Sequence, residues 1–335
     1  MLQSKAKITA FGTYVPERIL SNADLEKMVD TNDEWIVQRT GMRERRIAAE
    51  DQFVSDLAVK AVEDMIQRYG ADVQDVDMIL VATSTPEYPF PNTASRIQAK
   101  LNIPQTGAMD LSAACAGFVY GLQLADSLIT SGMYRKVLVV GTETLSKITD
   151  YTDRSTCILF GDGAGAFLLE RTEGKGNSLA ALSGTQGEGG IHVYSSGLSS
   201  EMDGVSLQGK NGSLVQNGRE VYKWAVRLIP EQLPKLIAKA GLQAEQIDWF
   251  VPHSANLRMI EAMCERGPIP MERTLTSAEY RGNTSAASIP LAIQLAVDAG
   301  KVKQGQRLAL FGFGGGLTYA GLVVEWGVPD SAQQS

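Results

Sequence analysis

A cysteine lies where a short apolar run gives way to a long amphipathic one, in "DLSAACAGFVYG" (110–121). The first run predicts a strand and the second a helix, which places Cys115 at a helix N-terminus. Unpaired backbone N–H groups and the positive end of the helix dipole favour an anion there. We therefore expect a thiol of lowered pKa that acts as a nucleophile. An isolated cysteine is more often structural, and that is what we expect of Cys157 and Cys264, which lack such a setting.

Two further side chains could work with this thiol. His253 follows the apolar run "WFVP", at the strand end where α/β proteins bind ligands, although a core histidine is an equal alternative. The other histidine, His192, lies in a loop-like stretch and is expected to be solvated. Asn283 could cap a helix, but Thr284 or Ser285 could do so instead and leave its amide free to donate into a site.

Two glycine-rich tracts invite a comparison with phosphate-binding loops. The tract "FGFGGGLTYAG" (311–321) suits a turn whose backbone N–H groups approach a ligand, as in half of an oxyanion hole. No helix of the right kind follows it, so a phosphate loop is excluded. The tract "GDGAGA" (161–166) fails for the same reason, and tight strand packing explains it better.

The elements that must position these residues alternate along the chain. Apolar strand-like runs lie at 77–84, 136–143, 164–170, 249–254 and 307–314, and helical runs at 53–69, 92–101, 115–131, 218–239, 254–266 and 285–299. This alternation predicts an α/β protein with largely parallel, buried strands.

The sequence also repeats internally. Residues 75–86 align with 246–257, 115–143 with 283–314, and 161–170 with 315–326. The repeat predicts two similar α/β halves, 1–172 and 173–335, related by pseudo-twofold symmetry, the second opening with an irregular stretch at 173–217. The alignment sets Cys115 at the position of Asn283, so both helix starts are expected to meet near His253.

Composition excludes several classes of protein. The 335 residues include 44% hydrophobic and 21% charged ones, which is ordinary for a globular chain with a large core. A net charge of −7 disfavours non-specific nucleic-acid binding. Three cysteines form neither a disulfide framework nor a zinc pattern, so no metal is expected and a cytoplasmic setting fits. We expect no signal peptide and no membrane insertion, because the longest uncharged tract, 308–324, is interrupted by glycines.

The motifs "AACAGF", "VPHSANLR", "GNTSAAS" and "FGGGLT", in this order, resemble the beta-ketoacyl-acyl-carrier-protein synthase III family of the thiolase superfamily. The segments 31–46, 151–166 and 217–226 also match, so the resemblance spans nearly the whole chain. It implies a homodimeric, five-layered α-β-α-β-α thiolase-like fold and a catalytic triad of Cys115, His253 and Asn283. The implied activity is that of an acyltransferase without cofactors, which condenses an acyl-CoA with malonyl-acyl-carrier protein (malonyl-ACP). An acyl-cysteine intermediate forms, 3-oxoacyl-ACP and CO2 are released, and fatty acid biosynthesis begins.

The resemblance also assigns roles around the triad. It implies an oxyanion hole at the N–H groups of Cys115 and Gly315, CoA contacts at Trp35, Arg39, Arg154 and Asn256, an acyl-pocket residue Phe90 donated to the partner subunit, and ACP docking at Arg258. Tyr222 departs from the family, which often has Phe there. From spacing alone, Arg219, Lys223 and Arg227 would form one basic stripe on a helix, either for an acidic carrier protein or as an ordinary solvated face.

Rival interpretations explain less. A cysteine peptidase uses the same three residue types in this order, but its signature is missing and the repeat stays unexplained. A non-enzymatic acyl-CoA-binding relative would be indicated by Ala or Ser at position 115. Synthases I and II need a second histidine, thiolases a second cysteine, and plant-type polyketide synthases a "GFGPG" loop. A quinolone- or polyketide-type synthase with the same triad remains an open alternative. The choice of an acetyl or a branched primer depends on the depth of the pocket near Phe90.

Overall fold

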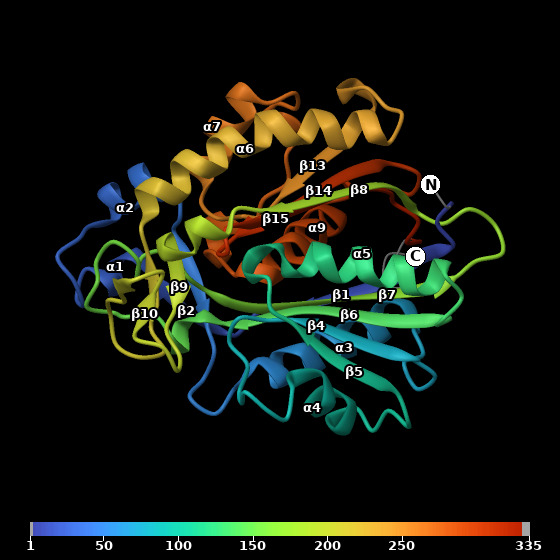
Figure 1. Ribbon diagram of the computed structural model, residues 1–335, viewed down its shortest axis with the longest axis horizontal. Helices are drawn as coiled ribbons and strands as arrows, with labels where there is room; N and C mark the ends of the chain where they lie inside the picture. The colour runs from blue at the N-terminus through green and yellow to red at the C-terminus, as the bar shows by residue number, and fades with distance from the viewer. Residues whose placement is uncertain (1–2, 330–335) are drawn as a thin grey trace.

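The computed structural model describes residues 3–329 and has a mixed α/β architecture built on two sheets (Figure 1). The first sheet has the strand order β1-β7-β6-β4-β5 and the second the order β13-β14-β15-β8. The first sheet comprises β1 (Ala6–Tyr14), β4 (Met78–Ala82), β5 (Gly107–Leu111), β6 (Lys136–Thr144) and β7 (Asp162–Arg171). The second comprises β8 (Ser178–Thr185), β13 (Trp249–Pro252), β14 (Arg307–Gly314) and β15 (Thr318–Glu325).

The prediction of largely parallel strands is wrong. Strand β4 pairs in parallel with β5 and β6, and β13 does so with β14. The pairs β1–β7, β6–β7, β14–β15 and β15–β8 are antiparallel. A parallel pair needs a crossover element, whereas β14 reaches β15 through the short turn 315–317. Strand β8 lies inside the stretch that we expected to be irregular. It forms the edge of the second sheet, and its small residues do not show the pattern of a strand in the sequence.

Helices cover both faces of each sheet (Figure 1). Between the two sheets lie α5 (Gly117–Thr130) and α9 (Ser288–Asp298), whose side chains share one apolar core with both sheets. The other face of the first sheet packs against α3 (Val54–Tyr69) and α4 (Thr93–Lys100). The other face of the second sheet packs against α6 (Gly218–Lys239) and α7 (Leu257–Arg266). Every residue of β6 is buried, because helices cover both of its faces.

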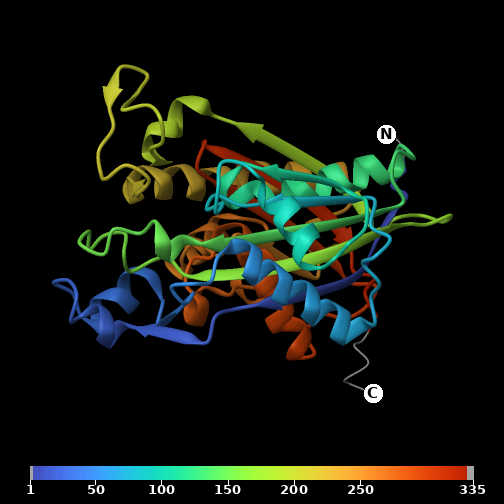
Figure 2. The same ribbon diagram turned by 90° about the horizontal axis from the view of Figure 1, so that it is seen from below.

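The smaller elements extend from this framework. They are β2 (Arg18–Ser21), α1 (Asn22–Leu25), α2 (Asp33–Thr40), β3 (Glu44–Ile47), β9 (Val193–Ser195), β10 (Glu201–Met202), β11 (Val205–Ser206), β12 (Leu214–Gln216) and α8 (Ala278–Arg281). Figure 2 shows that the segments around 20–45, 145–160 and 195–215 gather at one end of the molecule.

The internal repeat appears in the backbone as two matching turns. A short 3-10 turn, η1 (Ala114–Ala116), leads into α5, and another, η6 (Ser285–Ala287), leads into α9. The first residue of each turn has a left-handed backbone, with φ 44° at Ala114 and 46° at Ser285. In this register Cys115 corresponds to Ala286, so the predicted equivalence of Cys115 and Asn283 is wrong by three residues.

Candidate active site

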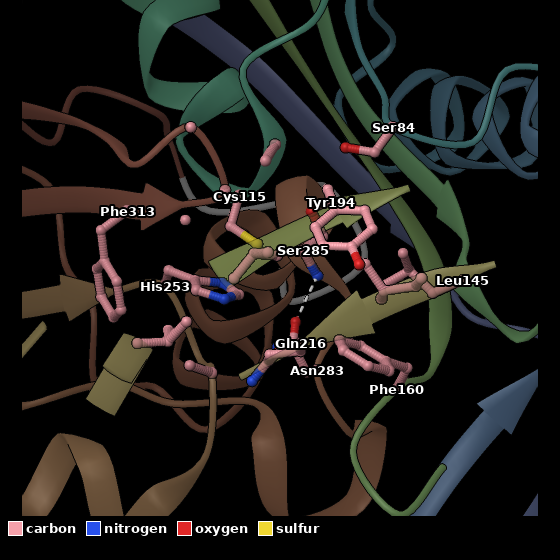
Figure 3. Close-up of a pocket in the computed structure, with 18 of the residues that line it drawn as sticks. Ser84, Cys115, Leu145, Phe160, Tyr194, Gln216, His253, Asn283, Ser285 and Phe313 are labelled. Atoms are coloured by element: carbon pink, nitrogen blue, oxygen red, sulfur yellow. Dashed lines mark hydrogen bonds between the residues drawn. The ribbon is translucent and has the colours of Figure 1, made fainter. Parts of the chain in front are cut away.

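A cavity of about 550 Å³ opens between the ends of the two sheets (Figure 3). Its walls come from both halves of the sequence, and Cys115, His253 and Asn283 all line it. The other lining residues that matter below are Ser84, Asn256, Ser285, Phe313 and Gly315. The three predicted catalytic side chains therefore surround one space.

Strand β14 lies directly behind the cysteine turn. A Cβ on Gly312 would stand 2.8 Å from the Cα of Ala116 and 3.0 Å from the carbonyl oxygen of Cys115. The glycine-rich tract at 311–321 is thus explained by close backbone approach, here to the turn that carries Cys115. The second tract packs equally tightly, as predicted, because a Cβ on Gly165 would meet Pro290 of α9 at 2.3 Å.

The expected lowering of the Cys115 pKa is wrong. The pKa of Cys115 is raised to about 12, chiefly because burial removes the sulfur from water; hydrogen bonding from the Ser285 side chain partly opposes the rise, and the nearby charge of Glu143 adds to it. A helix N-terminus favours a charge by roughly 0.3–1 kcal/mol, which is less than the cost of removing that charge from water. The Cys115 thiol is therefore protonated at neutral pH.

His253 lies just beyond the end of β13, with its backbone N–H donating to Phe311. Its Nδ1 is 2.8 Å from the hydroxyl oxygen of Ser288, and its ring packs edge-on against Phe313 at 5.3 Å between centroids. Burial lowers the pKa of His253 to about 3, although a hydrogen bond to the backbone of Ser285 acts in the opposite direction. The imidazole is therefore neutral at physiological pH.

Asn283 is held on its backbone and on its side chain. Its N–H donates to Leu159 at 2.8 Å, and its carbonyl accepts from Gly161 at 3.0 Å. Its Oδ1 accepts from the Ser285 N–H at 2.9 Å (Figure 3, dashed line). The sequence left open whether Asn283 or one of its neighbours would cap this turn. Asn283 does so itself, and its Nδ2 group still lacks a hydrogen-bond partner within residues 3–329.

Three residues that the family resemblance assigned to CoA lie close together. The guanidinium groups of Arg39 and Arg154 lie 5.7 Å and 4.6 Å from the centre of the Trp35 ring. Arg154 also lies 3.6 Å from Asp30. Asn256 lines the cavity, but its Oδ1 caps α7 by accepting from the Met259 N–H at 2.8 Å.

Other predicted positions lie outside the cavity. Phe90 is 85% exposed on the surface. Arg219, Lys223 and Arg227 are exposed along α6, and Lys223 pairs with Glu220 at 2.6 Å. Arg258 is exposed at the start of α7 and pairs with Glu261 at 2.8 Å. His192 is half-buried beside a second, smaller cleft, and is not the solvated loop residue that we expected.

Sequence reasoning missed Ser285 and Glu143. We expected Ser285 only as a possible helix cap. Its side chain also lowers the pKa of the buried Cys115 thiol. Glu143 is a fully buried carboxyl near the end of strand β6. A lone acidic residue in the run "KVLVVGTE" was the signal that could have revealed it.

Among residues 3–329 the three cysteines are unpaired, and no group of His, Cys, Asp and Glu side chains could hold a metal ion. No helix in this part of the chain is long and apolar enough to cross a membrane.

Known proteins match this chain over nearly its full length. The family model for 3-oxoacyl-[acyl-carrier-protein] synthase III matches residues 109–187, and the model for its C-terminal part matches residues 237–326. Beta-ketoacyl-[acyl-carrier-protein] synthase III 2 of Bacillus subtilis is 61% identical over 97% of this chain and 100% of its own length. The Bacillus cereus protein of the same name is 60% identical over 97% and 99%. The crystal structure of a beta-ketoacyl-[acyl carrier protein] synthase III from Thermus thermophilus superposes with a TM-score of 0.92 at 47% identity, covering 96% of this chain and 99% of that one.

The fold and the cysteine-lined cavity thus define a thiolase-like condensing enzyme. The sequence matches are more specific than the fold, because they extend over both halves at high identity. The chain belongs to the beta-ketoacyl-[acyl-carrier-protein] synthase III family. It is accordingly an acyltransferase of fatty acid biosynthesis.

Proposed function

We propose that this enzyme condenses an acyl-CoA primer with malonyl-ACP through an acyl intermediate on Cys115. The observation that carries the proposal is the single cavity that Cys115, His253 and Asn283 line together with Gly315. These positions correspond to a nucleophile, two hydrogen-bond donors and a backbone oxyanion site.

In the first half-reaction the Cys115 sulfur attacks the thioester carbonyl of the acyl-CoA. The N–H groups of Cys115 and Gly315 stabilise the oxyanion, and the bond to the CoA sulfur breaks as the tetrahedral intermediate collapses. Because burial keeps the thiol protonated, its proton leaves as the new bond forms and ends on the departing CoA thiol. The products are acyl-Cys115 and free CoA.

In the second half-reaction malonyl-ACP loses CO2 to give an enolate. The enolate oxygen accepts hydrogen bonds from the ring N–H of neutral His253 and from the Nδ2 group of Asn283, each worth about 3 kcal/mol. A cavity with few waters favours decarboxylation, because the charged carboxylate is destabilised there. The enolate carbon then attacks the acyl carbonyl, and 3-oxoacyl-ACP leaves as the Cys115 sulfur regains a proton.

The residues assigned to CoA and to the carrier protein support the same proposed function. Trp35, with Arg39 and Arg154 near its ring, offers a flat aromatic surface and two cations to a nucleotide that carries phosphates. The exposed cations Arg219, Lys223, Arg227 and Arg258 would meet an acidic carrier protein. The ion pairs that Lys223 and Arg258 now make are exposed, so exchanging partners costs little.

The quaternary arrangement is part of the proposal. Tyr88, Phe90 and Met109 are exposed apolar side chains, of a kind that protein contacts usually cover. We infer a homodimer in which Phe90 enters the acyl pocket of the partner subunit. Each subunit would have two α/β halves, 1–172 and 173–335, in five layers with pseudo-twofold symmetry, and would work in the cytoplasm.

The decisive experiment separates the two half-reactions. Incubation with acetyl-CoA or isobutyryl-CoA should release free CoA and add the acyl mass to the peptide that contains Cys115. Adding malonyl-ACP should then release CO2 and 3-oxoacyl-ACP. Cys115→Ser should abolish both steps, whereas Cys157→Ser is the matched control. Normal condensation by Cys115→Ser would overturn the assignment of the nucleophile. A panel of primers and extenders also tests the quinolone- or polyketide-type alternative, which predicts that malonyl-ACP is a poor extender.

A further inference from the structure

The carboxyl group of Glu143 is buried within a few side chains of the cavity, and the proposed mechanism does not use it. Glu143 lies near the end of β6 and is 0% exposed. Its Oε2 accepts from the Ser84 N–H at 3.0 Å and from the Thr85 hydroxyl at 2.8 Å, with a longer contact to Thr83 at 3.3 Å. One oxygen thus holds the turn after β4, which includes the cavity residue Ser84.

The other oxygen, Oε1, does not hold a neighbouring segment in this way. It is buried and makes no hydrogen bond of normal geometry with the described residues. A buried carboxylate oxygen without a donor is costly, so an atom in this state calls for an explanation. The turn η6, which begins at Ser285, packs against β6, the strand that carries Glu143.

The Ser285 side chain links Glu143 to the nucleophile. Figure 3 shows Ser285 beside the sulfur of Cys115, where its hydrogen bonding lowers the pKa of the buried thiol. The same side chain acts on Glu143: burial raises the pKa of Glu143 to about 7, and hydrogen bonds from Thr85, Ser84 and Ser285 oppose that rise. The Ser285 side chain therefore affects the pKa of both a buried carboxyl group and a buried thiol.

We propose that Glu143 is a positioning residue whose buried carboxyl group sets the direction of the Ser285 hydroxyl, and so controls how easily the Cys115 sulfur carries negative charge. The proposal rests on the proposed function only in taking Cys115 as the nucleophile.

The direction follows from the two protonation states of the acid. Protonated Glu143 donates its O–H to the Ser285 oxygen, and the Ser285 O–H then points to the Cys115 sulfur and stabilises a thiolate. Ionised Glu143 accepts the Ser285 O–H, which removes the donor from the sulfur. Its negative charge also raises the pKa of Cys115 directly.

Other ionisable groups on the elements around β6 do not share this position. They hydrogen-bond elsewhere or face solvent: Asp56, Lys60, Glu63, Asp64, Arg68, Asp126, Lys136, Asp162, Glu170 and Arg171. Neutral His253 is the other titratable group of the cavity, and burial keeps its pKa far below neutral pH.

The test is the pH dependence of Cys115 alkylation by iodoacetamide, followed by peptide mass mapping and requiring no substrate. In the wild type the logarithm of the rate should rise with pH, flatten near pH 7 as Glu143 ionises, and rise again. Glu143→Gln keeps an acceptor for the turn at 83–85 and a permanent donor for Ser285. It should remove the flattening and react about tenfold faster than the wild type at pH 8.5, which corresponds to one unit in the pKa of the thiol.

Two further variants keep the test decisive. Ser285→Ala removes the hydroxyl without new strain, because Ala114 already occupies the same left-handed backbone in the matching turn. It should alkylate about tenfold more slowly than the wild type at pH 6. Asp162→Asn alters another buried carboxyl, on the neighbouring strand, and should leave the profile unchanged.

A Glu143→Gln profile that coincides with the wild type would overturn the proposal. If Glu143→Gln does not fold, an unchanged rate in Ser285→Ala would overturn it as well. Acylation of the wild type by acyl-CoA is measured separately. Failure there would refute the proposed function, while the alkylation profiles would still decide the role of Glu143.

Discussion

Gly314 lies directly against Cys115. A Cβ at Gly314 would stand 2.9 Å from the Cβ of Cys115 and 3.0 Å from its sulfur. Real Cβ atoms rarely approach this closely, so strand β14 fixes the position of Cys115 by lacking a side chain there.

Gly314→Ala should therefore displace the cysteine turn and slow acylation of Cys115 by about 100-fold, because a misplacement of ~1 Å has an effect of that size. The rate of CoA release measures the loss, and thermal unfolding shows whether the fold persists. Gly174→Ala is the matched control, since its Cβ would meet only Thr172 Oγ1 at 3.7 Å. Acylation of Gly314→Ala at the wild-type rate would contradict the importance of this contact.

Asn283 should matter more for decarboxylation than for acylation. Asn283→Asp keeps the oxygen that binds the Ser285 N–H but replaces the Nδ2 donor. We expect decarboxylation to fall by about 10²–10³-fold, while acylation changes far less. The release of ¹⁴CO2 from labelled malonyl-ACP and the release of CoA measure the two steps. Equal losses in both would argue against a role in binding the enolate.

Comparing Asn283→Ala with Asn283→Asp separates the role of the Nδ2 donor from that of the oxygen that caps the turn η6. Asn283→Ala removes both Nδ2 and the oxygen that holds the turn η6, so it should unfold more easily than Asn283→Asp. Comparable thermal stability of the two variants would show that the hydrogen bond to Ser285 contributes little.

His253 should make the enzyme sensitive to acid. Its pKa is lowered from 6.5 to about 3 in the folded protein, so between these values the unfolded chain binds more protons and stability rises with pH. This contribution is lost as the pH falls below about 6.5, with a limiting slope of about 1.4 kcal/mol per pH unit. Urea unfolding between pH 4.5 and 6.5 should show a shallower slope for His253→Asn than for the wild type. Identical slopes for His253→Asn and the wild type would mean that the imidazole is already charged when folded.

Trp35 should contribute to binding and not to chemistry. Trp35→Ala removes the ring that Arg39 and Arg154 approach, so KM for acetyl-CoA should rise about tenfold, as expected for a loss of about 1–2 kcal/mol. A short acetyl thioester without the nucleotide serves as the control substrate. If Trp35→Ala impairs both substrates equally, the ring does not bind the nucleotide.

The sequence by itself determined where several of the main helices and strands form and which motifs identify the family. The helix expected at 218–239 has those bounds, and the strand runs at 136–143 and 307–314 became β6 and β14. The motifs around Cys115, His253 and Asn283 also identified the family that the comparisons show. Local periodicity and short motifs suffice for this, because each is encoded in consecutive residues.

The tertiary structure decided what depends on several elements at once. Strand directions depend on how the connections run, and the true partner of Cys115 in the repeat emerged only from the backbone of the two turns. The pKa of Cys115 is raised, whereas the sequence led us to expect a lowered one. The surrounding elements remove the sulfur from water, and this outweighs the helix end, which alone would favour the anion. Glu143 came next to the active site for the same reason: burial is set by the packing of segments that are distant in the sequence.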